Sequence, residues 1–125
     1  MKYQRKRKFK QIYEEIKGEK WLTHSNGNEY SDHGRFKSEW GHVSFGCIDK
    51  KQGYMRQAVK LGNRFVTFQL HRLIMEAWDP LGELLVIHEF GKAVVDHKNG
   101  CKTDNRLSNL EWVSYSENTR RFNKK

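Results

Sequence analysis

Residues 94–118, VVDHKNGCKTDNRLSNLEWVSYSEN, place an asparagine-rich polar stretch between two apolar runs. The run VVDH (residues 94–97) is typical of a strand that ends in polar side chains, and LEWVS (residues 110–114) predicts a second strand. Ser114 and Glu117 have the spacing of a capping box, which predicts that a helix begins there. We therefore expect a strand, a loop, a second strand and a helix, in this order.

Four polar side chains converge if the second strand returns antiparallel over the first: Asp96, His97, Asn109 and Asn118. Carboxylate and amide oxygens are hard ligands that suit Mg²⁺ or Mn²⁺ and are poor ligands for zinc. A neutral histidine beside such an ion can accept a proton from water near neutral pH, and an asparagine can hold its ring in orientation. This combination is consistent with metal-dependent phosphodiester hydrolysis.

The same residues have a purely structural interpretation. Asn and Asp side chains close turns by bonding to their own backbone, so residues 98–109 could form a loop stabilised by its own side chains. A single histidine near the end of a strand is also more often structural than catalytic. Spacing alone leaves both interpretations open.

The charge of the chain favours a polyanionic partner. The chain has 125 residues, enough for one domain, and its 24 basic and 15 acidic residues give a net charge of +9. Basic residues cluster at both ends, with six among the first ten residues and four in the C-terminal run TRRFNKK. Each phosphate that such residues neutralise releases condensed counterions, which favours nucleic acid as the partner. A solvated basic surface is the alternative.

The sequence shows neither a membrane segment nor a secretory signal. No apolar run approaches the roughly 20 residues of a membrane span, and the basic N-terminus lacks an apolar segment with a cleavage site. We therefore expect a cytoplasmic protein with no membrane partner. Cys47 and Cys101 lie far apart and form no CxxC pair, so we expect two reduced thiols, with a disulfide as the alternative.

The chain reads as one small α+β domain over residues 20–125, preceded by a basic arm over residues 1–19 that includes a short helix. Turn residues at Asn26-Gly27 and around Gly34 predict an N-terminal β-hairpin region. The elements expected further along are short and bounded by turn residues. They are a half-buried strand at residues 41–49, a hairpin over residues 55–70 with its turn at Gly62-Asn63, a helix over residues 71–79 ended by Pro80, and a β-like run over residues 84–97.

The combination of HRLIMEAW (residues 71–78) with VDHKNGCKTDNRLSNLEWVSYSEN (residues 95–118) resembles the HNH endonucleases. Residues 29–38, EYSDHGRFKS, are similar to an element often found at the N-terminus of phage and intron-encoded members. The resemblance covers about residues 20–120. It implies an α+β domain that ends in a ββα-metal (His-Me finger) motif at about residues 93–123, and a homing-type or phage nuclease.

The resemblance also implies roles for the four convergent residues. Asp96 and Asn118 are expected to bind a divalent ion, Mg²⁺ or Mn²⁺, His97 to be the general base, and Asn109 to orient His97, which makes this the His-Asn-Asn variant. Asn105 is assigned to the shape of the loop. With two protein ligands, water and DNA oxygens would complete the coordination of the metal. The expected products carry 5′-phosphate and 3′-hydroxyl ends.

Duplex DNA is the implied partner, and the expected contacts are with its phosphates. The residues expected to make them are Arg35, Lys37, Lys98, Lys102, Arg120 and Arg121. One active site cuts one strand, so a monomer is expected to nick, whereas a homodimer could cut both strands. A non-catalytic nucleic-acid-binding protein on the same scaffold and an RNA-directed nuclease are the alternatives. The intact set of four residues favours the enzyme.

Overall fold

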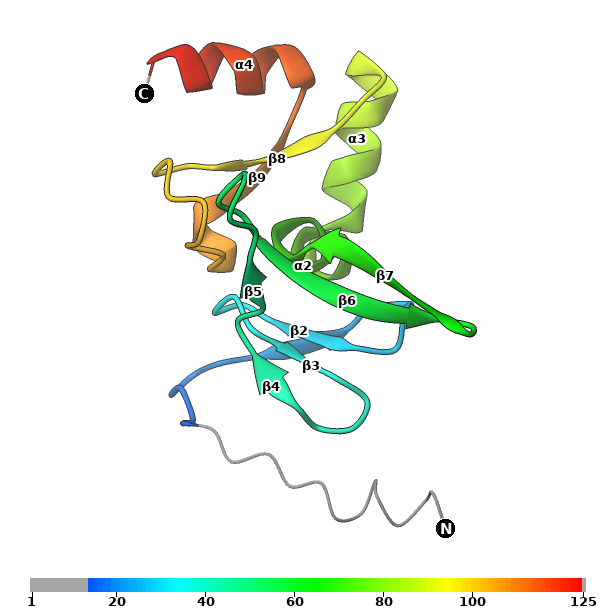
Figure 1. Cartoon of the computed structure of the whole chain (residues 1–125). Coiled ribbons are helices and arrows are strands. Elements are labelled where there is room, and N and C mark those ends of the chain that lie inside the picture. The colour runs from blue at the N-terminus through cyan, green and yellow to red at the C-terminus, as the bar shows by residue number, and fades with distance from the viewer. Residues whose placement is uncertain (1–13, 125) are drawn as a thin grey trace, which may run out of the picture.

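Short strands and short helices alternate along residues 14–124, the part of the chain described by the structure, a computed structural model (Figure 1). In chain order the elements are β1 (Trp21–Thr23), β2 (Glu29–Ser31), β3 (Phe36–Lys37), β4 (Val43–Ser44), β5 (Cys47–Ile48), β6 (Met55–Leu61), β7 (Arg64–Gln69), α2 (Leu70–Trp78), α3 (Pro80–Phe90), β8 (Val94–His97), the 3₁₀ turn η1 (Leu107–Asn109), β9 (Leu110–Val113) and α4 (Tyr115–Lys124). The predicted α+β class is confirmed. The short helix expected at the end of the basic arm is not present in residues 14–19, and residues 1–13 of the arm lie outside the described residues.

The strands form three small antiparallel sheets, with orders β1-β2-β3-β4, β5-β6-β7 and β8-β9. The first sheet confirms the predicted N-terminal hairpin region. In the second, Leu61 pairs with Arg64, so a two-residue loop joins β6 to β7 as predicted. Figure 1 shows the first sheet at one end of the molecule and α4 at the other, with α2 between them.

Helix α2 packs at the junction of the three sheets and organises the core. It buries Leu70, Leu73, Ile74 and Met75. These side chains join one hydrophobic cluster with residues of the surrounding strands: Tyr30 from β2, Val59 from β6, and Leu110 and Trp112 from β9. A two-stranded sheet such as β8–β9 is at best marginally stable alone, so it depends on packing against this helix. No helix among residues 14–124 is long and apolar enough to span a bilayer.

The expected β-like run over residues 84–97 is wrong for most of its length, because residues 80–90 form helix α3. The Asp79 side chain accepts a hydrogen bond from the Gly82 N–H at 3.0 Å, and Pro80 occupies the first turn, where its missing N–H costs nothing. Pro80 therefore starts a helix as well as following α2. The apolar residues of α3 are spread around the helix and do not form one apolar face, so its sequence shows no helical period.

The strand expected at residues 41–49 is interrupted. It divides into β4 and β5, which belong to different sheets. In one half-buried strand the alternating residues Val43, Phe45 and Cys47 would share the buried face, but only Val43 is buried, and Phe45 is 53% exposed. The break falls at Gly46, where a Cβ atom would lie 2.6 Å from the Arg56 carbonyl oxygen. The chain can approach β6 this closely only without a side chain.

The turn between β2 and β3 packs directly on the loop that follows β8. The Leu107 N–H donates to the Asp32 carbonyl oxygen at 3.0 Å. Gly34 has a φ of +89°, and a Cβ atom there would lie 3.0 Å from the Asn105 carbonyl carbon and 3.1 Å from its oxygen. The N-terminal sheet thus supports the backbone of the asparagine-rich loop.

Substitution of Gly34 tests this support. We expect Gly34→Ala to lower the free energy of unfolding by about 1–3 kcal/mol more than Gly27→Ala, measured by urea denaturation. Gly27 is the matched control, because its φ of +94° imposes the same backbone strain, whereas a Cβ atom added there would meet no heavy atom within 4 Å. Equal losses in the two variants would mean that the Gly34 contact adds nothing.

Candidate functional site

The β8–β9 hairpin and α4 build the predicted strand, loop, strand and helix. Asp96 pairs with Glu111 and His97 with Leu110 in antiparallel register. The Ser114 hydroxyl accepts a hydrogen bond from the Glu117 N–H at 3.0 Å, as its capping-box spacing predicted, and α4 begins at the next residue. The arrangement of the motif is therefore confirmed.

Three of the four predicted site residues line one pocket of about 290 Å³: Asp96, His97 and Asn118. Asp96 and His97 come from the end of β8 and are 4% and 5% exposed. Asn118 comes from the first turn of α4, and Tyr54 and Lys102 also line the pocket. Tertiary folding thus brings a carboxylate, an imidazole and an amide to one hollow.

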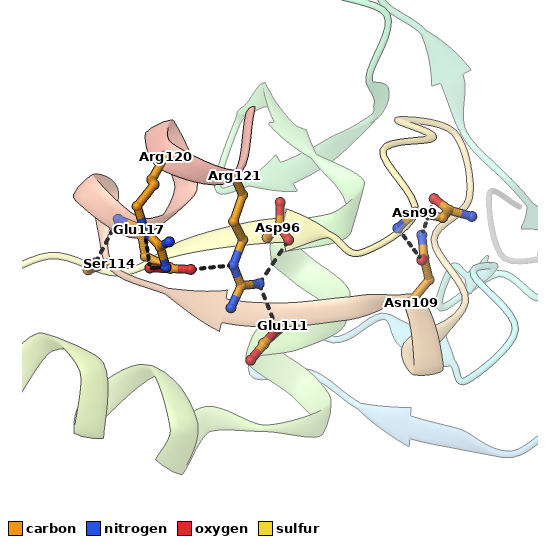
Figure 2. A network of polar contacts seen from close by, with 8 residues as sticks. All are labelled: Asp96, Asn99, Asn109, Glu111, Ser114, Glu117, Arg120 and Arg121. Carbon is orange, nitrogen blue, oxygen red and sulfur yellow. Dashed lines mark hydrogen bonds and ion pairs between the residues drawn. The ribbon is translucent and has the colours of Figure 1, made fainter. Parts of the chain in front are cut away.

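Asn109 lies outside the lining of this pocket and holds the loop together. Its side-chain oxygen accepts from the Asn99 N–H at 3.0 Å, and its amide group donates to the Asn99 Oδ1 at 3.0 Å and to the Asp104 carbonyl at 2.9 Å. Figure 2 shows the side chains of Asn99 and Asn109 facing one another across the base of the loop. The Asn109 side chain therefore bonds to the loop in this structure and does not make the expected orienting contact with His97.

The amide that contacts the His97 ring is that of Asn105. Its Oδ1 lies 2.7 Å from Nε2 of His97, and both side chains are buried. An amide oxygen only accepts hydrogen bonds, so Nε2 donates, and in the neutral ring the lone pair is then on Nδ1. Asn105 thus does more than shape the loop. Its eight-residue separation from His97 matches no spacing rule, so no local pattern pointed to this contact.

Two further aromatic rings enclose His97. The centroid of the His71 ring lies 4.8 Å from that of His97 in an edge-on arrangement, and the Tyr54 ring stacks at 5.8 Å. His71 is 5% exposed, and its Nδ1 has no hydrogen-bond partner among the described residues. Burial, with a smaller effect of His97, lowers the pKa of His71 to about 3. His71 is therefore neutral near pH 7. Its contact with His97 could not be predicted from the sequence, because α2 is distant from His97 along the chain.

An ion-pair network lies on the α4 side of Asp96 (Figure 2). Nη1 of Arg121 lies 3.1 Å from Oδ2 of Asp96 and 2.8 Å from Oε1 of Glu111, and its Nε lies 2.6 Å from Oε2 of Glu117. Hydrogen bonds from Arg121 to Glu111 first, and then to Glu117 and Asp96, raise its pKa above the usual value. Arg120 pairs with Glu117 at 2.5 Å.

The predicted phosphate contacts divide into buried, paired and exposed residues. Arg35 is 4% exposed, forms an ion pair with Glu19 and donates to the Glu14 carbonyl at 3.1 Å, so its guanidinium is engaged inside the protein. Arg121 is held by the three acids of the network. Lys98 is exposed directly after His97 in the chain, and Lys102 is exposed, lines the pocket and donates from its Nζ to the Gln52 carbonyl at 2.9 Å. The Lys37 Nζ lies 4.5 Å from the centroid of the Trp21 ring.

The donor atoms at the pocket fit a hard divalent ion. Asp96 offers a carboxylate and Asn118 an amide oxygen, the ligand types that Mg²⁺ and Mn²⁺ prefer. Within residues 14–124 no group of three or more His, Cys, Asp or Glu side chains could hold a metal, so water and substrate oxygens would complete the coordination. Cys47 and Cys101 are free thiols, as expected.

The buried His71 predicts a pH dependence of stability. Its ordinary pKa of 6.5 falls to about 3 on folding, so between these values the unfolded chain binds a proton that the folded chain does not. Stability is then lost as the pH falls below about 6.5, by up to about 1.4 kcal/mol per pH unit. We expect urea denaturation at pH 7, 6 and 5 to show a shallower loss for His71→Gln than for the wild type. The exposed-residue control His88→Gln should behave as wild type, and identical slopes for all three proteins would contradict the prediction.

Comparison with known proteins shows that this chain is similar to HNH endonucleases. The HNH endonuclease family model matches residues 86–120. Over 68 residues the chain is 32% identical to a protein of Acanthamoeba polyphaga mimivirus named as an uncharacterized HNH endonuclease, a match that covers 54% of this chain and 18% of that protein. The structure is similar to that of the HNH homing endonuclease I-HmuI, with a TM-score of 0.64 and 28% identity, over 84% of this chain and 58% of that chain.

The chain thus spans less than a fifth of the viral protein and less than two thirds of the solved homing endonuclease chain. Within that span the matched segment contains β8, β9 and the first turns of α4, which carry Asp96, His97 and Asn118. The resemblance seen in the sequence is therefore confirmed: the chain carries the HNH endonuclease motif, within a fold similar to that of an HNH homing endonuclease.

Proposed function

We propose that this chain is a metal-dependent DNA endonuclease whose reaction centre is the pocket of Asp96, His97 and Asn118. The observation that carries the proposal is the convergence of these three side chains on one hollow, with the His97 ring held by Asn105. Support comes from the similar solved structure, which is described as DNA binding and cleavage by an HNH homing endonuclease.

Asp96 and Asn118 are the residues that would hold the divalent ion, Mg²⁺ or Mn²⁺. When bound, the ion would stabilise charge on the scissile phosphate and on the leaving 3′ oxygen. The protein supplies the rest of the environment: β8 fixes the Asp96 carboxylate in the interior, and the first turn of α4 brings Asn118 to the same pocket.

His97 is the general base in this proposal. The Asn105 oxygen holds the proton on Nε2, so Nδ1 is the nitrogen that accepts a proton from the attacking water. The same oxygen stabilises the imidazolium that results, because it accepts from a donor that has become more acidic. The neutral His71 ring packs against His97 without adding a second positive charge. Asn109 supports His97 indirectly, because its hydrogen bonds close the loop that carries Asn105.

Duplex DNA is the proposed substrate, in agreement with the net charge of +9. Lys102 is exposed and lines the proposed catalytic pocket, and Lys98 is exposed directly after His97 in the chain. Both are proposed to contact phosphates, with Lys37 on the N-terminal sheet as a more distant contact. One site per chain supports nicking by a monomer, with 5′-phosphate and 3′-hydroxyl products. A cytoplasmic location and a phage origin remain part of the proposal.

Cleavage of supercoiled plasmid tests the function. With Mg²⁺ or Mn²⁺ we expect the wild type to produce relaxed circles, and EDTA to abolish the reaction. His97→Ala should lose at least about 100-fold in rate, the usual contribution of a general base. His88→Ala is the matched control, because His88 is exposed on α3 outside the site.

Equal rates for wild type and His97→Ala would remove His97 as the base. Binding of several duplexes and single strands without any cutting would instead support the non-catalytic alternative. Linear product formed without accumulation of nicked circles would contradict nicking by a monomer.

The salt dependence of binding tests the phosphate contacts. Fluorescence anisotropy with a labelled duplex in EDTA measures affinity without cleavage. We expect Lys98→Gln to weaken binding and to reduce the slope of log K against log salt by about 0.9, the value for one lost phosphate contact. Lys60→Gln is the control, since Lys60 is also exposed but lies on β6, outside the motif. The same change of slope in both variants would show only a general effect of charge.

A further inference from the structure

The face of the β8–β9 hairpin that carries Asp96 concentrates negative charge. Asp96 and Glu111 are direct partners across the two strands, so their side chains lie on the same face. Like charges in this position are destabilising, and Asp96 is only 4% exposed. A carboxylate that is this buried requires a cationic partner or a metal ion.

Arg121 supplies that positive charge. Its Nη1 contacts both carboxylates of the cross-strand pair, at 3.1 Å from Asp96 and 2.8 Å from Glu111. Arg121 follows Asn118 by three residues on α4, so the two side chains lie on the same side of the helix. Figure 2 shows the Arg121 side chain descending from α4 between Asp96 and Glu111. The guanidinium therefore reaches the pocket residue that is proposed to bind the metal.

We propose that Arg121 is the counter-cation of Asp96 in the metal-free protein and that it competes with the divalent ion for this carboxylate. This inference rests on the proposed function in taking Asp96 as a metal ligand. Binding of the ion to Asp96 weakens the hydrogen bond that Arg121 donates to Oδ2 of this carboxylate. Glu111 and Glu117 make this feasible, because they continue to pair with the guanidinium when its bond to Asp96 weakens.

The competition has a defined consequence for metal binding. Two cations that share one carboxylate oppose one another, so removal of Arg121 must strengthen binding of the ion. The neighbouring Arg120 provides a matched control: its described ion pair is with Glu117, so its loss removes the same charge from the same turn without releasing Asp96. The difference between the two variants isolates the contact with Asp96.

The test is a titration of the full DNA-free chain with Mn²⁺, in which electron paramagnetic resonance measures the free ion. We expect Arg121→Gln to bind Mn²⁺ at least about fivefold more tightly than the wild type, the lower end of typical coupling between two ligands. Arg120→Gln should change the affinity less than Arg121→Gln does. Asp96→Asn combined with Arg121→Gln should abolish the gain, and circular dichroism in EDTA verifies that each variant is folded.

Equal or weaker binding by Arg121→Gln, an equal gain in Arg120→Gln, or no binding by any protein would overturn the inference. If Arg121→Gln does not fold, nuclear magnetic resonance of the wild type decides. Addition of Mg²⁺ should then shift the Arg121 Nε–H signal more than that of Arg120, and an unchanged Arg121 signal would refute competition. Plasmid cleavage by the wild type is a separate readout: cleavage without the Mn²⁺ pattern leaves the nuclease function intact, and the pattern without cleavage leaves the competition intact.

Discussion

Burial of helix α2 is the constraint on which the rest of the structure depends. Strands of all three sheets contact α2, whose Leu70, Leu73 and Ile74 belong to the shared core. The two-stranded β8–β9 sheet in particular is too small to be stable alone. The same helix carries His71 into contact with the His97 ring. The scaffold and the surroundings of the proposed base are therefore consequences of one packing arrangement.

Orientation of His97 depends on segments that are distant from it in the chain. Asn105 holds the ring, and Asn109 closes the loop around Asn105 through bonds to Asn99 and to the Asp104 carbonyl. The turn at Gly34 then supports the loop through its contact with the Asn105 backbone. Such support would serve the proposed role of His97 as a base, because small displacements reduce the rate of proton transfer.

The charges of the site differ from those of the chain as a whole. The net charge is +9, yet Asp96, Glu111 and Glu117 converge beside the pocket and are balanced there by Arg121. A positive surface suits the approach to a phosphate backbone, whereas a local excess of carboxylates suits a divalent ion. In the structure the Arg121 guanidinium pairs with these acids, which gives the buried Asp96 the cationic partner that it requires.

Local patterns in the sequence were sufficient for the elements whose signals involve neighbouring residues. The two-residue turn between β6 and β7, the apolar face of α2 and the Ser114 cap of α4 are of this kind, and the resemblance located Asp96, His97 and Asn118. Features that depend on partners elsewhere in the chain emerged only from the folded arrangement. Arg35 is buried against Glu19, Asn105 replaces Asn109 at the His97 ring, and α3 is a helix without a helical pattern. These features could not be predicted from the sequence, because hydrogen bonds, ion pairs and burial depend on distances in space. Residue spacing determines such distances only for residues within a turn or two of one another along the chain.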